Sequence, residues 1–230
     1  MNILEVKNMS FSFKNNCVFK DFSMSFEKGK IFALLGHNGA GKTTFIRLCL
    51  GLLKEQKGKI LYFDDPNISY VPDRGGLFEF LTVEQNLNIF LKLNKVGDVN
   101  KREYSEKILI EWGLLNKKNT QVRYLSMGQK QRLSLIVAEV NDPDIIFLDE
   151  PSSSIDISSQ ELLNHHMKKL RDEGKTIILS SHDIQLIENV ADTILVINNG
   201  EIKYVEDISK IINLTSIYNH YTNEDTYENN

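Results

Sequence analysis

One glycine-rich stretch restricts the fold of this chain more than any other part of its sequence. The stretch, Gly36-His37-Asn38-Gly39-Ala40-Gly41-Lys42-Thr43, matches the pattern G-x-x-x-x-G-K-[ST] in full. It follows an apolar run at residues 31–35, which is typical of a buried strand, and precedes a helical pattern. We therefore expect an α/β protein in which this loop joins a strand of a parallel sheet to a helix.

The stretch has the chemistry of a phosphate-binding loop. Its glycines let successive backbone N–H groups face an anion, and the helix N-terminus adds its dipole. In this pattern Lys42 reaches the β and γ phosphates, and the Thr43 hydroxyl binds Mg²⁺. The sequence therefore predicts a nucleoside triphosphate with Mg²⁺, and we expect His37 to face solvent. The expected binding residues are Gly36, Asn38, Gly39, Ala40, Gly41, Lys42, Thr43 and Thr44.

A second apolar run ends in two acidic residues. Residues 144–150 read DIIFLDE, so that Asp149 and Glu150 stand where a buried strand ends. Asp149 is placed to hold Mg²⁺ through water. Glu150 can point at the attacking water as a general base, because two neighbouring carboxylates can have separate roles. The alternative is that Glu150 only ends the strand.

Hydrophobic patterns indicate how the rest of the chain is organised. Short apolar runs at 31–35, 145–148, 176–179 and 194–197 are typical of strands buried in a parallel sheet, whereas residues 22–26 alternate like an antiparallel strand. A hairpin turn is expected at 198–201. Helical patterns fill 75–140, with a capping box at Thr82 and Gln85, and a further capping box is expected at Ser158 and Glu161. We expect one domain with a core at 1–74 and 141–221, a helical lobe at 75–140 and a disordered tail at 222–230.

Composition and charge exclude some classes of function. Lys and Arg number 27 against 31 Asp and Glu, a net charge of −4. The chain therefore lacks the overall positive charge that would favour binding to nucleic acid. No apolar run approaches the ~18 residues of a membrane-spanning helix. We expect a cytoplasmic protein that reaches the membrane through a partner, with Cys17 and Cys49 as inert thiols.

A short stretch at residues 125–129, LSMGQ, poses a separate question. Ser126 and Gln129 have the spacing of a capping box at a helix start. The cap does not explain Gly128, because glycine in a first turn costs about 1 kcal/mol relative to alanine. A group that approaches the backbone closely would explain it.

These motifs, in this order along nearly the whole chain, resemble the ATP-binding subunit of an ABC transporter. The resemblance implies a P-loop NTPase core with a mostly parallel sheet, an antiparallel β subdomain and an inserted α-helical lobe. It implies ATP and Mg²⁺ as ligands and ATP hydrolysis as the activity. Two copies would sandwich two ATP molecules, and a transmembrane permease would be the second partner, with no nucleic acid. The lack of a further regulatory domain and the acidic residue Asp73 resemble export subunits.

The resemblance also assigns roles to single residues. Ser126, Gly128 and Gln129 match the signature motif, which contacts the ATP bound by the second subunit. His182 matches the switch histidine, which contacts the γ-phosphate and holds the attacking water. Asp156 matches the aspartate of the D-loop, and Phe13 the aromatic that stacks on adenine. From spacing alone, Asp156 could equally cap the following helix, and Phe13 could be a core aromatic.

Three positions depart from the usual pattern of the family. Asp73 stands where a glutamine is usual, so a charged side chain lies near Mg²⁺ and ATP, where it can bind metal or repel phosphate. We expect Asp73 to couple the helical lobe to the core. Met127 replaces a glycine, and Ser154-Ile155 replaces Gly-Leu.

Other readings explain less of the sequence. A small GTPase needs an N-K-x-D motif, and a P-loop kinase would leave LSMGQ unexplained. A non-transport ABC ATPase acting on a nucleic-acid or ribosomal partner is the closer alternative, but this chain has no sustained heptads and no basic stripe. For a permease, we expect an apolar docking surface that includes Leu77, Phe78, Phe80 and Leu81, unless these side chains are buried in the lobe. His165 and His166 do not share a helix face, so we expect them at the surface or at its rim.

Overall fold

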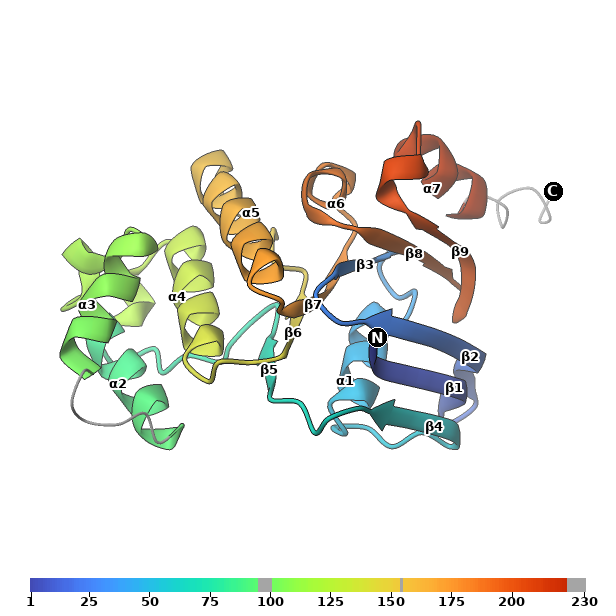
Figure 1. Cartoon of the computed structure of the whole chain (residues 1–230), viewed down its shortest axis with the longest axis horizontal. Coiled ribbons are helices and arrows are strands. Elements are labelled where there is room, and N and C mark those ends of the chain that lie inside the picture. Colours follow the sequence, from blue (N-terminus) through green and yellow to red (C-terminus); the bar gives the residue numbers. More distant parts are fainter. Residues whose placement is uncertain (95–100, 154, 223–230) are drawn as a thin grey trace.

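A computed structural model describes residues 1–94, 101–153 and 155–222. The predictions for Ser154 and for most of the tail, residues 223–230, lie outside these ranges. Figure 1 shows the two sheets and the helices around them.

The larger sheet has six strands in the order β5-β6-β7-β3-β8-β9. Five of them, β5, β6, β7, β3 and β8, run parallel, and β9 pairs antiparallel with β8. The strands are β3 (Ile31–Leu35), β5 (Ile68–Val71), β6 (Ile145–Asp149), β7 (Thr176–Ser181), β8 (Thr193–Asn198) and β9 (Glu201–Asp207). The predicted buried strands and the terminal hairpin are therefore confirmed. Because parallel strands end at one edge, the residues that follow β3, β6 and β7 lie together.

The smaller sheet is antiparallel, with the order β2-β1-β4. Its strands are β1 (Asn2–Phe13), β2 (Asn16–Glu27) and β4 (Lys57–Tyr62). The alternating residues 22–26 lie in β2, which confirms the antiparallel prediction for that stretch. The hairpin between β1 and β2 brings Phe13 to its tip.

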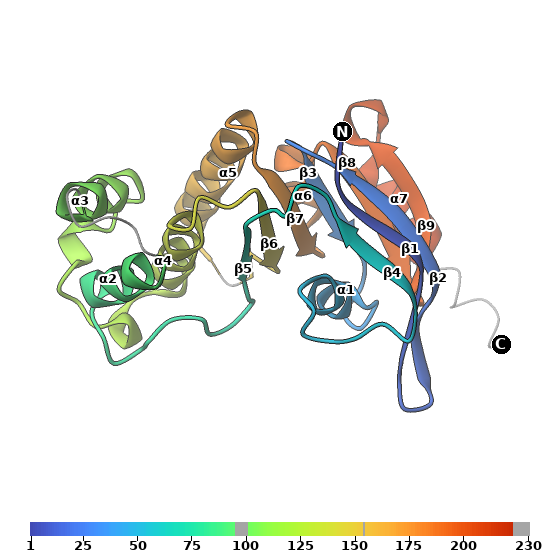
Figure 2. The ribbon, with the colours of Figure 1, turned by 60° about the horizontal axis from the view of Figure 1, so that its bottom comes forward.

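Seven α-helices occur in the described ranges. They are α1 (Lys42–Cys49), α2 (Val83–Leu93), α3 (Lys101–Glu111), α4 (Met127–Glu139), α5 (Ile157–Asp172), α6 (Ile184–Val190) and α7 (Leu214–Thr222), with 3-10 turns at Leu115–Lys117, Val122–Tyr124 and Ile208–Lys210. Helices α2, α3 and α4 lie at the end of the molecule away from the antiparallel sheet (Figures 1 and 2). The fold class expected from the sequence is confirmed.

Alternate residues of the larger sheet face two different hydrophobic clusters. Ala33 and Leu35 of β3 pack in the cluster that includes α2 to α6, whereas Phe32 and Leu34 pack against α1 and the antiparallel sheet. On that second side, the ring of Phe45 in α1 lies 5.1 Å from the ring of Phe22 in β2. Helix α1 is therefore clamped between the two sheets, which fixes the loop that precedes it.

Side-chain caps set where several helices begin. Thr82 and Gln85 form the predicted capping box of α2, and Ser126 and Gln129 form that of α4. The predicted box at Ser158 and Glu161 is wrong, because α5 begins earlier and is capped by Asp156. An aspartate is as good a cap as a serine, so spacing could not separate the two choices.

Candidate nucleotide-binding site

Local backbone geometry explains the glycines of the loop between β3 and α1. Gly39 and Gly41 have φ angles of 91° and 104°, a region that L side chains rarely adopt. A Cβ atom on Gly36 would lie 2.6 Å from the carbonyl oxygen of Ile197 on β8. The loop therefore needs glycine for its turns at two positions and for close packing at the third.

A cavity of about 400 Å³ opens beside this loop. The loop and α1 line it on one side, the β1–β2 hairpin on another, and two acidic residues complete it. Its lining residues are Phe13, Asn16, Val18, Asn38, Gly39, Gly41, Lys42, Thr43, Thr44, Asp73 and Glu150. The structure thus brings most of the predicted binding residues together. Phe13 is 47% exposed, with its ring edge-on to Phe11 at 4.8 Å, so it is not a core aromatic.

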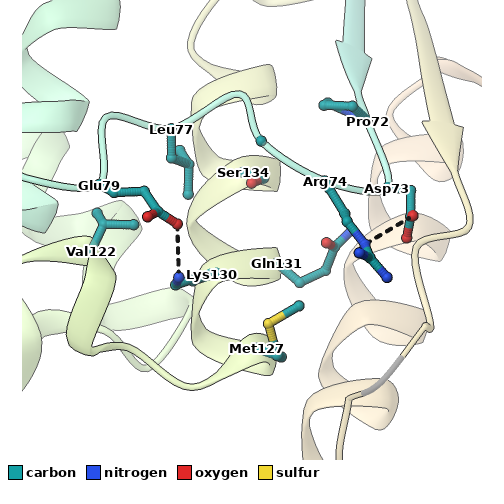
Figure 3. A pocket seen from close by; sticks show the side chains of 11 residues that line it. Pro72, Asp73, Arg74, Leu77, Glu79, Val122, Met127, Lys130, Gln131 and Ser134 are labelled. Carbon is teal, nitrogen blue, oxygen red and sulfur yellow. Dashed lines mark hydrogen bonds and ion pairs between the residues drawn. The ribbon is translucent and has the colours of Figure 1, made fainter.

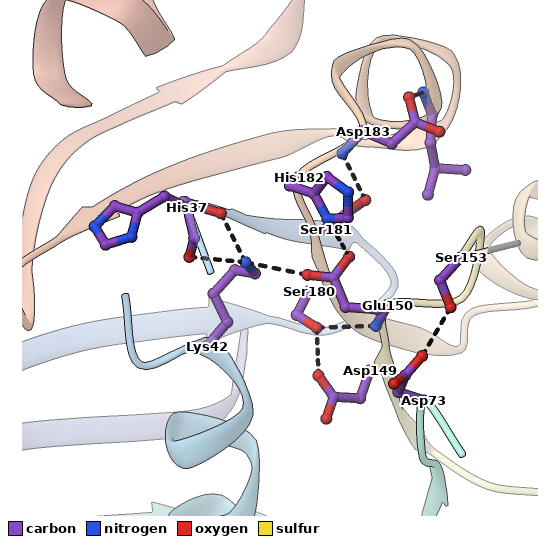
Figure 4. A network of polar contacts seen from close by, with 12 residues as sticks. His37, Lys42, Asp73, Asp149, Glu150, Ser153, Ser180, Ser181, His182 and Asp183 are labelled. Atoms are coloured by element: carbon purple, nitrogen blue, oxygen red, sulfur yellow. Dashed lines mark hydrogen bonds and ion pairs between the residues drawn. The ribbon is translucent and has the colours of Figure 1, made fainter. Parts of the chain in front are cut away.

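Lys42 is held inside the site by three oxygen atoms. Its Nζ donates to the carbonyl oxygens of Gly36, at 2.6 Å, and His37, at 3.3 Å. It also lies 3.1 Å from Oε1 of Glu150 in an ion pair (Figure 4). The lysine side chain is only 6% exposed, so these oxygens replace the water that the ammonium group would otherwise bind.

Glu150 links the lysine to the edge of β7. Its φ angle of 48° is unusual for a residue with a side chain, and its N–H donates to the carbonyl oxygen and the hydroxyl of Ser180, at 3.1 and 3.0 Å. Its Oε2 lies 2.9 Å from Nδ1 of His182. This backbone turn aims the carboxylate between Lys42 and His182 (Figure 4).

Thr43, which lines the cavity, is hydrogen-bonded to Asp149 at the end of β6. The Thr43 hydroxyl donates to Oδ1 of Asp149 at 2.9 Å, and the Ser180 hydroxyl donates to the same atom at 2.6 Å. Magnesium is bound through oxygen atoms, typically one or two carboxylates together with substrate phosphates. No cluster of three or more His, Cys, Asp or Glu residues suited to a metal occurs in the described ranges. The Thr43 hydroxyl and the Asp149 carboxylate are oxygen ligands of the kind that fits Mg²⁺ bound together with a phosphate.

Asp73 lines the cavity but is already bound at both of its oxygens. Oδ1 accepts a hydrogen bond of 2.7 Å from the Ser153 hydroxyl, and Oδ2 lies 3.6 Å from Nε of Arg74. Ser153 carried no signal in the sequence, since a serine after an acidic strand end has no distinctive spacing. The predicted metal and coupling roles of Asp73 stay predictions.

The signature residues lie outside the cavity of their own chain. Ser126, Gly128 and Gln129 begin α4 and do not line that cavity. A Cβ on Gly128 would lie 2.4 Å from Oγ of Ser159 and 3.1 Å from Oδ2 of Asp156. Helix α5 and its cap in the same chain therefore approach Gly128 closely, a contact that the sequence left unidentified.

Asp156 acts as a helix cap in this structure. It accepts hydrogen bonds from the Ser158 hydroxyl, at 2.5 Å, and from the N–H and hydroxyl of Ser159, at 2.9 Å each. These bonds, led by the one from Ser158, hold the pKa of the Asp156 carboxyl well below its usual range. Of the two alternatives left by spacing, the cap is confirmed, and a D-loop role stays a prediction.

Two histidines are not where the sequence placed them. His37 is not simply solvent-facing, because its ring contacts Asn198 and its exposure is intermediate. His166 is buried, with its ring stacked on Trp112 at 3.7 Å between centroids. His165 is exposed as expected. A helical pattern reports which residues share a face, but not which neighbouring helix covers that face.

Comparisons with known proteins agree with this geometry. Residues 19–153 match the family described as ABC transporter. An uncharacterised ABC transporter ATP-binding protein of Methanocaldococcus jannaschii is 34% identical, over 90% of this chain and 79% of its own. The SkfA peptide export ATP-binding protein of Bacillus subtilis is 33% identical over 88% of each chain. A spermidine/putrescine import ATP-binding protein of Acetivibrio thermocellus is 32% identical, over 87% of this chain and 60% of its own.

The fold also has solved counterparts. A dimeric ATP-binding cassette in a post-hydrolysis state, bound to ADP and Pi, superposes with a TM-score of 0.80 at 24% identity. The superposition covers 90% of this chain and 99% of that one. None of the described helices combines the length and apolar character needed to cross a membrane.

Proposed function

The chain belongs to the ABC transporter family, and we propose that it is the ATP-hydrolysing subunit of an exporter that works as a homodimer with a separate transmembrane permease. One observation carries the proposal. Lys42, Thr43 and Glu150 line one cavity, Asp149 accepts a hydrogen bond from Thr43, and His182 contacts Glu150. This arrangement supports binding and hydrolysis of a triphosphate. We propose residues 75–140 as the helical lobe of this one domain.

The proposed chemistry assigns a separate task to each side chain. Lys42 exchanges the Glu150 carboxylate for the β and γ phosphates when ATP enters. Glu150, released from the lysine, takes a proton from the attacking water, while His182 holds that water against the γ-phosphate. Thr43 and Asp149 would hold Mg²⁺, which neutralises charge on the phosphate oxygens when bound. Phe13 offers its exposed ring to the adenine.

Two copies are needed to complete each site in this proposal. Ser126, exposed at the N-terminus of α4, together with the Gly128 amide and the helix dipole, would contact the γ-phosphate held by the other copy. The support is that these groups do not line their own cavity, and that the solved cassette named above is a dimer. Hydrolysis would then separate the copies.

A groove beside the helical region is the proposed permease site (Figure 3). It has a volume of about 320 Å³ and is lined by Pro72, Asp73, Arg74, Gly75, Leu77, Glu79, Val122, Met127, Lys130, Gln131 and Ser134. The neighbouring Phe78 and Phe80 are 49% and 74% exposed, which supports docking, whereas Leu77 packs against the core. Asp73 lines both this groove and the nucleotide cavity, so it can couple the two.

The proposed direction of transport is export. The relatives named above include one export and one import protein. The acidic Asp73 and the resemblance to export subunits favour export.

Copurification tests the transport role. Tagged protein is isolated in mild detergent from membranes of the native host, and its partner is identified by mass spectrometry. We expect a partner with several membrane-spanning segments, lost in Phe80→Asp but kept in the control Leu52→Asp. Leu52 is 64% exposed, against 74% for Phe80, and is distant in sequence. A ribosomal or nucleic-acid partner would support the non-transport alternative instead.

A further inference from the structure

The phosphate loop carries a histidine whose ring is bound at both nitrogens. Nε2 of His37 lies 3.1 Å from Oδ1 of Asn198, and Nδ1 lies 2.8 Å from the carbonyl oxygen of Asn38. Asn198 ends β8 and is only 2% exposed. The ring points away from Lys42 and Glu150 (Figure 4). It therefore contacts β8, which lies beside the loop, and not the part of the loop that would face the phosphates.

A second contact of Asn198 fixes the orientation of its amide. Its Nδ2 lies 2.8 Å from the carbonyl oxygen of Tyr221, near the end of α7. A carbonyl oxygen only accepts hydrogen bonds, so the amide nitrogen must face Tyr221 and Oδ1 must face the histidine. Because Oδ1 also only accepts, Nε2 of His37 must carry a hydrogen.

The same reasoning applies to the other ring nitrogen. Nδ1 of His37 faces the carbonyl oxygen of Asn38, which accepts and cannot donate. Neutral imidazole carries one N–H, whereas imidazolium carries two. The two hydrogen bonds therefore form together only on the doubly protonated ring, and loss of either proton breaks one of them.

The three elements that contact His37 or its partner Asn198 carry charged or titratable groups. On the loop, Lys42 Nζ donates to the His37 carbonyl oxygen at 3.3 Å. On β9, Glu201 is opposite Asn198 in the strand pairing and is ion-paired with Lys203 at 2.9 Å. On α7, the His220 ring lies 4.8 Å from the ring of Tyr221.

We propose that His37 is a proton-dependent positioning residue, which ties the phosphate loop to β8 and, through Asn198, to α7. The inference rests on the nucleotide site of the proposed function. With both bonds made, the loop is held in the shape in which its amides face the phosphates, and such preorganisation raises affinity. Loss of either ring proton would break one of these bonds, so nucleotide affinity should fall as pH rises.

Nuclear magnetic resonance of the nucleotide-free protein tests the protonation directly. In uniformly ¹⁵N-labelled protein, the ring nitrogens of the five histidines are followed from pH 5.5 to 8.5, and His37→Gln identifies the signals of His37. We expect the titration midpoint of His37 to rise in Asn198→Asp, because a carboxylate favours imidazolium, and to fall in Asn198→Leu. An unchanged midpoint in both folded variants would overturn the proposal.

A second test measures the affinity for ATP and needs only the variant His37→Gln. The Kd for ATP is measured for wild type and for this variant at pH 6 and pH 8. At each pH the ratio of the two Kd values is compared, because titration of the nucleotide affects both proteins equally. We expect wild type to bind about threefold to tenfold tighter at pH 6, the worth of one hydrogen bond, and this advantage to vanish at pH 8. A ratio that does not change with pH contradicts the proposal, whereas loss of ATP binding in both proteins would contradict the proposed function.

Discussion

Lys42 and Glu150 form an ion pair inside the nucleotide cavity, with 3.1 Å between Nζ and Oε1. The two side chains are 6% and 16% exposed, so little water screens the pair. Each group is therefore occupied by the other before nucleotide enters. A triphosphate that takes over the lysine would also release the carboxylate, which would connect ATP binding to activation of the proposed general base.

The first prediction concerns the lysine. Lys42→Ala removes the cation that would hold the phosphates and leaves Glu150 without its partner. We expect no ATP binding at millimolar ATP in an equilibrium assay with a fluorescent analogue. The matched control is Lys54→Ala at an exposed lysine, which should bind like wild type. ATP binding by Lys42→Ala within about threefold of wild type would remove the lysine from the site; that margin is below about 0.7 kcal/mol.

The second prediction separates binding from hydrolysis. Glu150→Gln keeps the size of the side chain but cannot accept a proton from water. We expect turnover to fall by roughly 10²–10⁴. ATP should bind at least as tightly as before, because glutamine competes less for Lys42. Phosphate release measures turnover, with the exposed Glu161→Gln as control. Turnover retained in Glu150→Gln would assign the general base to another residue.

The third prediction uses the hydrogen bond of 2.7 Å between Ser153 and Asp73. Asp73→Asn and Ser153→Ala each disturb this bond, and Asp73→Gln tests the residue usual in the family. All should leave ATP affinity intact and change turnover. If Asp73 and Ser153 act through their shared hydrogen bond, the turnover of the double variant should equal that of each single variant. The double-mutant cycle should then give a coupling energy of about 1 kcal/mol. Independent, multiplying effects would show that the bond carries no function.

The fourth prediction concerns pH and stability. Burial raises the pKa of Glu139 from its ordinary value of 4.5 to about 7. The protonated form therefore favours the folded state fully below pH 4.5, and this contribution is lost as pH rises to about 7. Glu139→Gln, which stays neutral, should be more stable than wild type at pH 8 by up to about 3 kcal/mol, since one pKa unit corresponds to about 1.4 kcal/mol.

Denaturant unfolding at pH 5 and pH 8 measures this difference. The stability gain of Glu139→Gln should be much smaller at pH 5 than at pH 8. Equal gains at the two pH values would mean that Glu139 does not change its charge over that range. The exposed Glu161→Gln serves again as the control, with no pH-dependent gain expected.

Strands and loops of this fold were predictable because their signals are local. The apolar run of β3, the glycines after it and the acidic end of β6 follow from backbone geometry and burial alone. Contacts between distant segments were not predictable in this way. The approach of Ser159 to Gly128, the bond from Ser153 to Asp73 and the anchoring of His37 each join residues from separate elements. Spacing cannot rank such contacts, as the choice of Asp156 over Ser158 as the cap of α5 shows.

The central claim is that ATP is shared between two copies of this chain. Its most direct test is the molar mass of Glu150→Gln by light scattering on a sizing column, with and without ATP and Mg²⁺. We predict 26.4 kDa without nucleotide and twice that mass with it. Adding Ser126→Arg should keep ATP binding and abolish the doubling. A mass that stays at one chain despite measured ATP binding would contradict the sandwich of two copies.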